Sequence, residues 1–256
     1  MHRIPVFGSR LATFALVELQ KLRHDRTELV TRGVQPMLWL IIFGETFSRV
    51  RGIDTSGVPY LSFLAPGIIA QSALFISIFY GIQIIWERDA GILNKLLVTP
   101  TPRAALIAGK AFAAGIRSIA QVLIIVALCL VLRIPIRFGP LFVFAAIAIV
   151  FLGAAFFSCL SMVLAGIMQS RDRMMGIGQA ITMPLFFASN ALYPVELMPR
   201  WLRGLSYVNP LSYEVTALRG LLIGAPTNLW IDFTVLTMAA LVGVWSAAAL
   251  LDRLVR

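Results

Sequence analysis

The chain has 256 residues, of which 59% are hydrophobic and only 13% are charged, and its mean hydropathy is +0.87. Soluble domains carry about a quarter charged residues, so this chain lacks the polar side chains needed to cover a water-facing surface. The composition therefore excludes a soluble globular domain and predicts an integral membrane protein. The net charge of +10 fits basic residues beside anionic headgroups, and does not by itself indicate a nucleic-acid partner.

The N-terminal part contains two predicted helices. Residues 9–24 carry an imperfect apolar stripe flanked by basic residues, which favours an amphipathic helix, either along the membrane surface or packed on protein. Residues 28–47 are predicted to form a first membrane span with charged ends at the two headgroup layers. Their charge-free stretch is short, so an interfacial or re-entrant segment is the alternative.

Five further segments are long and apolar enough to cross a bilayer, which takes about 20 residues. They cover residues 61–86, 106–132, 140–168, 174–193 and 231–251. The sequence thus predicts an all-α fold with six transmembrane helices in one domain, residues 1–256. The two cysteines, Cys129 and Cys159, lie within these apolar runs and are interpreted as packing residues; no metal site is predicted.

The basic residues are unevenly distributed between the two sides of this topology. Fourteen of the 22 lysines and arginines fall in the N-terminal region, residues 87–110, residues 171–173 and the C-terminal tail, against seven on the opposite side. Such an excess marks the cytoplasmic side of a membrane protein. Both termini are therefore predicted to lie in the cytoplasm, with the chain in the cytoplasmic (inner) membrane.

The long connection before the last span is not an ordinary loop. Residues 194–228 mix apolar and aromatic side chains with turn-forming prolines and asparagines. Such a composition is typical of short re-entrant helices that dip into the outer leaflet, with aromatic rings at headgroup depth.

No energy source is visible in the chain. Gly109-Lys110 is followed by Ala111, so the phosphate-binding loop that ends in Gly-Lys-Ser/Thr is absent and no ATP site is predicted. The spans show no pair of carboxylates or carboxylate with histidine, which disfavours an ion-coupled carrier. No catalytic constellation is evident either, although Glu196 with Arg200 and Arg203 keeps a membrane-embedded, lipid-modifying enzyme open as an alternative.

The segment between the second and third spans is the most informative. It reads Glu-Arg-Asp-Ala-Gly-Ile-Leu-Asn-Lys-Leu-Leu-Val-Thr-Pro over residues 87–100. The spacing of its leucines predicts a short amphipathic helix over residues 87–99, with acidic residues in its first turn and a stop before Pro100. By these criteria alone it is either a surface connector or a docking element.

This segment, with Arg103 and Gly109-Lys110, resembles the one after the second span in permease subunits of type-2 ATP-binding-cassette (ABC-2) exporters, in the branch of drug and lipo-oligosaccharide exporters. A second match, about a hundred residues away, is the outer-leaflet motif of that branch: Tyr193, Pro194, Asn209, Pro210 and Tyr213, followed by Arg219-Gly220. Two departures stand in the first motif, where Asp89 and Asn94 occupy positions at which glutamate is common.

The resemblance implies a transport subunit that is not itself an enzyme. A separate cassette ATPase subunit would bind ATP and magnesium, and two permeases, identical or not, would pair over two ATPases. A coupling helix would dock on the ATPase, and by analogy its contacts would involve Glu87, Arg88, Asp89, Gly91, Leu97, Thr99 and Pro100.

The substrate is expected to be amphipathic, such as a lipid, a lipid-linked glycan or a hydrophobic drug, because the spans are apolar with few polar groups. The substrate-binding residues are unknown at this point. Aromatic residues such as Phe75, Phe79 and Tyr80 are interpreted either as packing or lipid-facing residues or as the lining of an apolar path. An ion-coupled secondary transporter remains the main alternative.

Overall fold

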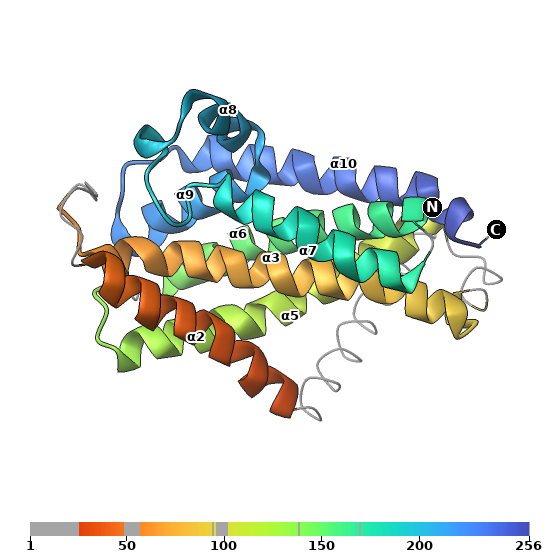
Figure 1. Cartoon of the computed structure of the whole chain (residues 1–256), viewed down its shortest axis with the longest axis horizontal. Helices are drawn as coiled ribbons and strands as arrows, with labels where there is room; N and C mark the ends of the chain where they lie inside the picture. The colour runs from red at the N-terminus through yellow and green to blue at the C-terminus, as the bar shows by residue number, and fades with distance from the viewer. Residues whose placement is uncertain are drawn as a thin grey trace.

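The structure is a computed structural model, and it describes residues 26–48, 57–93, 95, 102–137, 139–168 and 170–255. Within these ranges the chain is all-helical, as predicted, and no strand occurs (Figure 1). The named helices are α2 (Arg26–Ser48), α3 (Tyr60–Asp89), α5 (Arg103–Val131), α6 (Pro140–Met168), α7 (Arg171–Phe187), the 3₁₀ helix η1 (Val195–Leu197), α8 (Arg200–Val208), α9 (Pro210–Ile223) and α10 (Leu229–Val255). The helix expected over residues 9–24 lies outside the described residues.

Among the described residues, four helices are long and apolar enough to cross a membrane: α3, α5, α6 and the Leu229–Leu251 part of α10. In α2 the apolar stretch is the shorter Val34–Phe47, and α7 has only 17 residues. The described part of the chain is thus a multi-pass membrane protein with four clear candidate spans.

Helices α3 and α6 form the centre of the bundle, and both contact α5, α7, α9 and α10. The most apolar part of α3 is 78% buried within the chain, whereas that of α10 is only 28% buried. Exposed apolar side chains on α10 include Trp230, Leu241 and Trp245, which suits a helix that faces lipid. At the centre, the Ser161 hydroxyl of α6 donates to the Ile78 carbonyl of α3 at 2.7 Å, a polar contact typical of tightly packed membrane helices.

Two predicted boundaries need correction. The span expected over residues 174–193 ends at Phe187, and turns follow to Tyr193. The Ser189 hydroxyl donates to the Phe186 carbonyl and accepts from the Ala191 amide, and such local bonds compete with continuation of a helix. Likewise Glu87 to Asp89, expected to begin a new helix, form the last turn of α3.

The ends of the helices divide the molecule into two regions. The Asp89 end of α3 lies at the same end of the bundle as the C-terminal part of α10, and α8 lies toward the opposite end (Figure 1). We call residues 188–228 the cap; they comprise the turns after α7, η1, α8, α9 and the loop to α10.

Candidate functional site

An ion-pair cluster joins the end of α3 to two other helices. The Lys110 ammonium of α5 contacts the Glu87 carboxylate, and Lys110 is only 8% exposed. The Asp89 carboxylate accepts from Arg171 Nε at the start of α7 at 2.5 Å, and it also pairs with Arg88 at 2.8 Å. Three of the predicted coupling residues therefore contact charged groups of this chain, and the last turn of α3 is tied to both α5 and α7.

A left-handed glycine ends α3 directly after this cluster. Gly91 has a φ of +70°, its amide donates to the Arg88 carbonyl at 2.9 Å, and a Cβ built on it would meet no atom within 4 Å. This conformation is a common helix terminator and favours glycine strongly. Beyond it the chain turns helical again at Ile92, Leu93 and Lys95. Leu93 is fully buried in the core, so the new segment is anchored to the bundle at its first turn.

The rest of this predicted site lies beyond the residues that the structure describes. Leu97, Thr99 and Pro100 lie outside the described residues, as does Asn94. The helix predicted over residues 87–99 is therefore described only as far as Lys95. Its beginning is shifted to the residues after Gly91, because the glycine ends α3 there.

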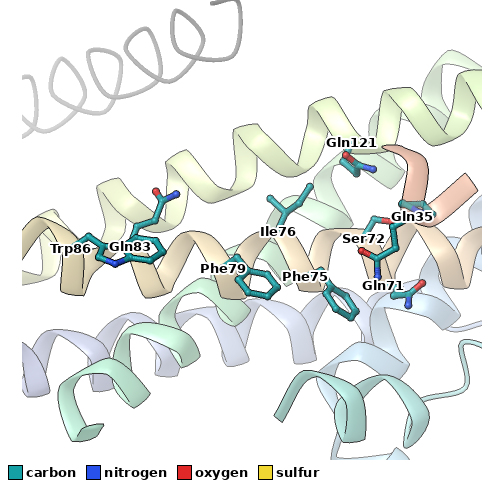
Figure 2. Close-up of a pocket in the computed structure, with 10 residues that line it drawn as sticks. Gln35, Gln71, Ser72, Phe75, Ile76, Phe79, Gln83, Trp86 and Gln121 are labelled. Atoms are coloured by element: carbon teal, nitrogen blue, oxygen red, sulfur yellow. The ribbon is translucent and has the colours of Figure 1, made fainter. Parts of the chain in front are cut away.

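A cavity of about 340 Å³ opens between α2, α3 and α5 (Figure 2). Its volume is within the range of small-molecule sites. The lining residues come mainly from one face of α3 and combine aromatic and aliphatic groups with amides: Gln35, Pro36, Gln71, Ser72, Phe75, Ile76, Phe79, Gln83, Trp86 and Gln121. Among the residues that the structure describes, no charged side chain lines it. The cavity can therefore hold an uncharged apolar body and offer it hydrogen bonds.

The polar groups concentrate toward one end of this cavity, where Gln35, Gln71, Ser72 and Gln121 lie near one another (Figure 2). Gln71 is 3% exposed, and its Nε2 has no hydrogen-bond partner within the described part of the chain. The Ser72 hydroxyl is satisfied by the Ile68 carbonyl. A buried amide donor without a partner is unfavourable, so Gln71 is a lining residue of the cavity whose donor is unused.

The predicted motif residues in the cap make hydrogen bonds to main-chain carbonyls. Asn209 donates from Nδ2 to the Leu185 carbonyl at 2.7 Å, and its Oδ1 caps α9 by accepting from the Leu211 amide. Pro210 follows at the first position of α9, where a missing N–H costs nothing. The Tyr193 and Tyr213 hydroxyls donate to the carbonyls of Phe187 and Tyr207. Pro194 precedes η1 as its N-cap residue.

Arg219 of α9 connects the cap to α3. It is 6% exposed, and its guanidinium donates to the carbonyls of Phe63, Asn190 and Ala191 at 3.3, 2.6 and 3.1 Å. The same group lies 3.5 Å above the Phe63 ring centroid, a cation–π contact. The other basic group considered from the sequence, Arg203, donates to the main-chain carbonyl of Glu196. That contact stabilises a turn and does not form a catalytic pair.

Comparison with known proteins decides the family. The family model described as ABC-2 type transporter matches residues 11–223, which is most of the chain. The chain belongs to the ABC-2 type transporter family. The ycf38 protein of Cyanophora paradoxa, named as a transport permease, is 32% identical over 206 residues, covering 78% of this chain and 69% of that protein.

Two other relatives of this ABC-2 permease have more specific names. The daunorubicin resistance ABC transporter permease protein DrrB1 of Streptomyces coeruleorubidus is 24% identical over 228 residues, covering 89% of this chain and 80% of DrrB1. The inner membrane transport permease YadH of Escherichia coli K12 is 27% identical over 197 residues, covering 75% and 73% of the two chains. The chain is thus a membrane permease subunit of an ABC transporter, and this family works with an ATPase subunit.

The structure adds functional candidates to this ABC-2 permease that sequence reasoning did not assign. Arg171 entered the sequence argument only as a topology charge, and Gln71 was not singled out. Lys110 was part of the family resemblance, although its pairing with Glu87 was not foreseen. A signal for Gln71 was available, because glutamines inside an apolar span are costly and commonly mark a polar site.

Proposed function

We propose that this permease exports an amphipathic, locally uncharged substrate across the cytoplasmic membrane, driven by ATP and magnesium bound to a separate ATPase subunit. Two permease chains would pair in the working transporter, as in the ABC-2 arrangement. The supporting observation is the cavity between α2, α3 and α5, which combines an apolar body with amide groups and, among the described residues, no charge.

The lining of the cavity indicates what kind of substrate fits. Phe75, Ile76 and Phe79 provide apolar and aromatic surface for a hydrocarbon or fused-ring body. The unused donor of Gln71 then favours a ligand with a carbonyl, ether or hydroxyl oxygen at that end. A hydrophobic drug meets both demands, and the relation to a daunorubicin resistance permease supports that choice.

The connection after α3 supplies a route for the force from the ATPase. A partner pressing on the segment after Gly91 would move α3, because Leu93 anchors that segment to the core. The ion pairs of Glu87 with Lys110 and of Asp89 with Arg171 would then carry the displacement into α5 and α7. In this proposal, Leu97, Thr99 and Pro100 contact the ATPase. The exposed parts of the other predicted coupling residues contact it too: Glu87, Arg88, Asp89 and Gly91.

The proposed topology has six spans with both termini in the cytoplasm. Helices α2 and α7 would be the two additional crossings; α7, of 17 residues, is about 26 Å long. The ion-pair cluster supports this topology, because it brings the end of α3, the first turns of α5 and the start of α7 to one side. That side carries the excess of basic residues that favours the cytoplasm. The relation to an inner membrane permease supports the choice of membrane.

The test is reconstitution of the permease with its ATPase in vesicles, using daunorubicin as the probe. We expect ATP-dependent, vanadate-sensitive movement of the probe, and at least a several-fold weaker apparent affinity in Gln71→Leu. Ser62→Ala is the matched control, because Ser62 is another buried polar residue of α3 that does not line the cavity. Equal losses in both variants would contradict the assignment of the cavity. Movement driven by an ion gradient without ATP would favour a secondary carrier.

A further inference from the structure

Glu214 is a buried carboxyl group that the proposed transport mechanism does not use. It lies in α9, outside the four candidate spans, and it is 0% exposed. Neither carboxyl oxygen has a hydrogen-bond partner within the described residues. An ionised carboxylate in such surroundings is strongly unfavourable, so the neutral acid is the stable form.

The site of Glu214 is shaped by a glycine of the neighbouring helix. Helix α9 packs on α6, and a Cβ added to Gly153 of α6 would lie 2.1 Å from Glu214 Oε2 and 2.6 Å from its Cδ. Any larger residue at position 153 would displace the carboxyl group. The missing side chain therefore creates the space in which the end of Glu214 sits, and the carboxyl group is trapped between two helices.

Among the described residues, the helices packed against α9 provide no basic partner for this acid. Over its described length, α6 contains no Asp, Glu, Lys or Arg, and its Cys159 is a buried free thiol. The charged residues of α3 are at its far end, in the ion-pair cluster, and Tyr60 at its near end donates to the Leu192 carbonyl. In α10, Asp232 accepts from Thr227.

The other ionisable groups of α9 itself, and one basic neighbour, are also directed elsewhere. Arg219 binds three main-chain carbonyls, and the Tyr213 hydroxyl donates to the Tyr207 carbonyl. The Arg137 guanidinium lies against Gly224, at the C-terminal cap of α9. Burial alone raises the pKa of Glu214 well above its ordinary value.

We propose that Glu214 is a proton-binding site that latches α9 of the cap onto α6. While the helices are packed, the acid is neutral and fills the space beside Gly153. When α9 separates from α6, water reaches the carboxyl group, and the proton leaves. Proton loss then opposes repacking, because an ionised Glu214 cannot return to its site without a large desolvation cost.

The direction of the pH dependence follows from linkage. The packed state holds one proton more than the separated state between the ordinary glutamate pKa of about 4.3 and the raised pKa of the packed site. In that window the equilibrium constant for separation rises about tenfold per pH unit. The latch is fully closed below the ordinary pKa and weakens as pH rises toward the raised one.

The first measurement is the infrared spectrum of the full-length permease in lipid vesicles at neutral pH. We expect the carbonyl-stretching band of a neutral carboxylic acid, and we expect Glu214→Gln to remove it. Glu196→Gln, which alters an exposed carboxylate of the cap, should leave the band unchanged. A spectrum in which Glu214→Gln removes carboxylate bands instead would overturn the proposal.

The second measurement compares thermal unfolding of the purified wild type and Glu214→Gln between about pH 5 and about pH 8. The wild type should lose stability relative to the variant as pH rises, and parallel profiles would contradict the latch. Glu214→Met adds a test that does not depend on the amide group introduced by Glu214→Gln. An apolar side chain should be tolerated at a site that holds a neutral acid. Failure of Glu214→Met to fold, with normal folding of Glu214→Gln, would also overturn it. Neither measurement uses transport, so both are independent of the proposed substrate.

Discussion

The two ends of α3 are held by different kinds of contact. At the Asp89 end, charged side chains pair with each other, and several remain partly open to solvent: the side chains of Arg171 and Asp89 are 48% and 28% exposed. At the Tyr60 end, buried side chains donate to main-chain carbonyls across the contact between α3 and the cap, as Tyr60 does to Leu192 and Arg219 does to Phe63. The Asp89 end is thus held by ion pairs between side chains, whereas the Tyr60 end is held by hydrogen bonds to main-chain carbonyls.

This difference has consequences for motion. Exposed ion pairs contribute about 0–1 kcal/mol each and are screened by salt, so they can break and re-form during a cycle. Hydrogen bonds from a charged group contribute about 1.5–3 kcal/mol, and a carbonyl left buried without a donor costs about 1–3 kcal/mol. We therefore infer that displacement begins at the ion-paired end, and that the cap end of α3 moves with the cap as one body.

Removing Arg219 should have the largest effect. Arg219→Leu removes the guanidinium that donates to the carbonyls of Phe63, Asn190 and Ala191. We expect a loss of about 2–4 kcal/mol in the free energy of unfolding. For a chain of this size that corresponds to a fall of about 5–10 °C in Tm, measurable by thermal unfolding of the purified permease.

Two variants control for this effect. Arg219→Lys keeps the charge but not the planar fork that reaches several carbonyls, so an intermediate loss is expected. Arg200→Leu removes an exposed cation of α8 and should shift Tm little. Equal behaviour of the Arg219 and Arg200 variants would remove the distinction drawn between the two ends.

The pair of Glu87 and Lys110 should show the next largest effect, because Lys110 is nearly buried. Glu87→Gln leaves the Lys110 ammonium without a counter-charge. A double-mutant cycle with Lys110→Met should give an interaction free energy of about 1–2 kcal/mol between the two side chains. The exchange Glu87→Lys with Lys110→Glu should recover part of the stability. A coupling near zero would show that the contact does not hold α3 to α5.

Much of this architecture was predictable, because long apolar runs leave few choices in a membrane. The residues of the third and fourth predicted spans became α5 (Arg103–Val131) and α6 (Pro140–Met168), close to the ranges read from the sequence. Turn chemistry was harder. The span expected to reach Tyr193 ends at Phe187, because Ser189 diverts hydrogen bonds that a continuing helix would need. Apolarity alone does not reveal such local competition.

The functional residues were predictable by type more than by contact. The resemblance pointed to Glu87, Asp89 and Gly91, and the structure describes all three at the end of α3. Their partners Lys110 and Arg171 are 23 and 82 residues away, and no local pattern relates such distant positions. The role of Gly153 depends equally on a distant residue, since its missing Cβ matters only because Glu214 lies against it.

Gly91→Ala tests the turn that ends α3, and the chain offers a matched control. Gly57 has a similar φ of +79°, and at both glycines a Cβ would meet no atom within 4 Å. Each substitution should cost about 1 kcal/mol of stability, from the left-handed conformation alone. Only Gly91→Ala should also reduce the substrate moved per ATP hydrolysed, because it favours extension of α3 and redirects the segment after it. If both variants move the same amount of substrate per ATP hydrolysed, the turn at Gly91 has no part in coupling ATP hydrolysis to transport.

The smallest effect is expected for the contact between Asp89 and Arg171, which is the most exposed part of the ion-pair cluster. Asp89→Asn keeps the shape of the side chain and removes the charge that holds α3 to α7, so coupling of ATP hydrolysis to transport should fall slightly at low salt. Screening shortens the reach of such charges to about 3 Å at molar salt, so the wild type and the variant should converge as ionic strength rises. A coupling defect caused by Glu87→Gln should persist at high salt, because its partner Lys110 is shielded from solvent. If both defects vanish in salt, the two pairs form one exposed network; if neither does, Asp89 acts through the shape of the α3 terminus and not through its charge.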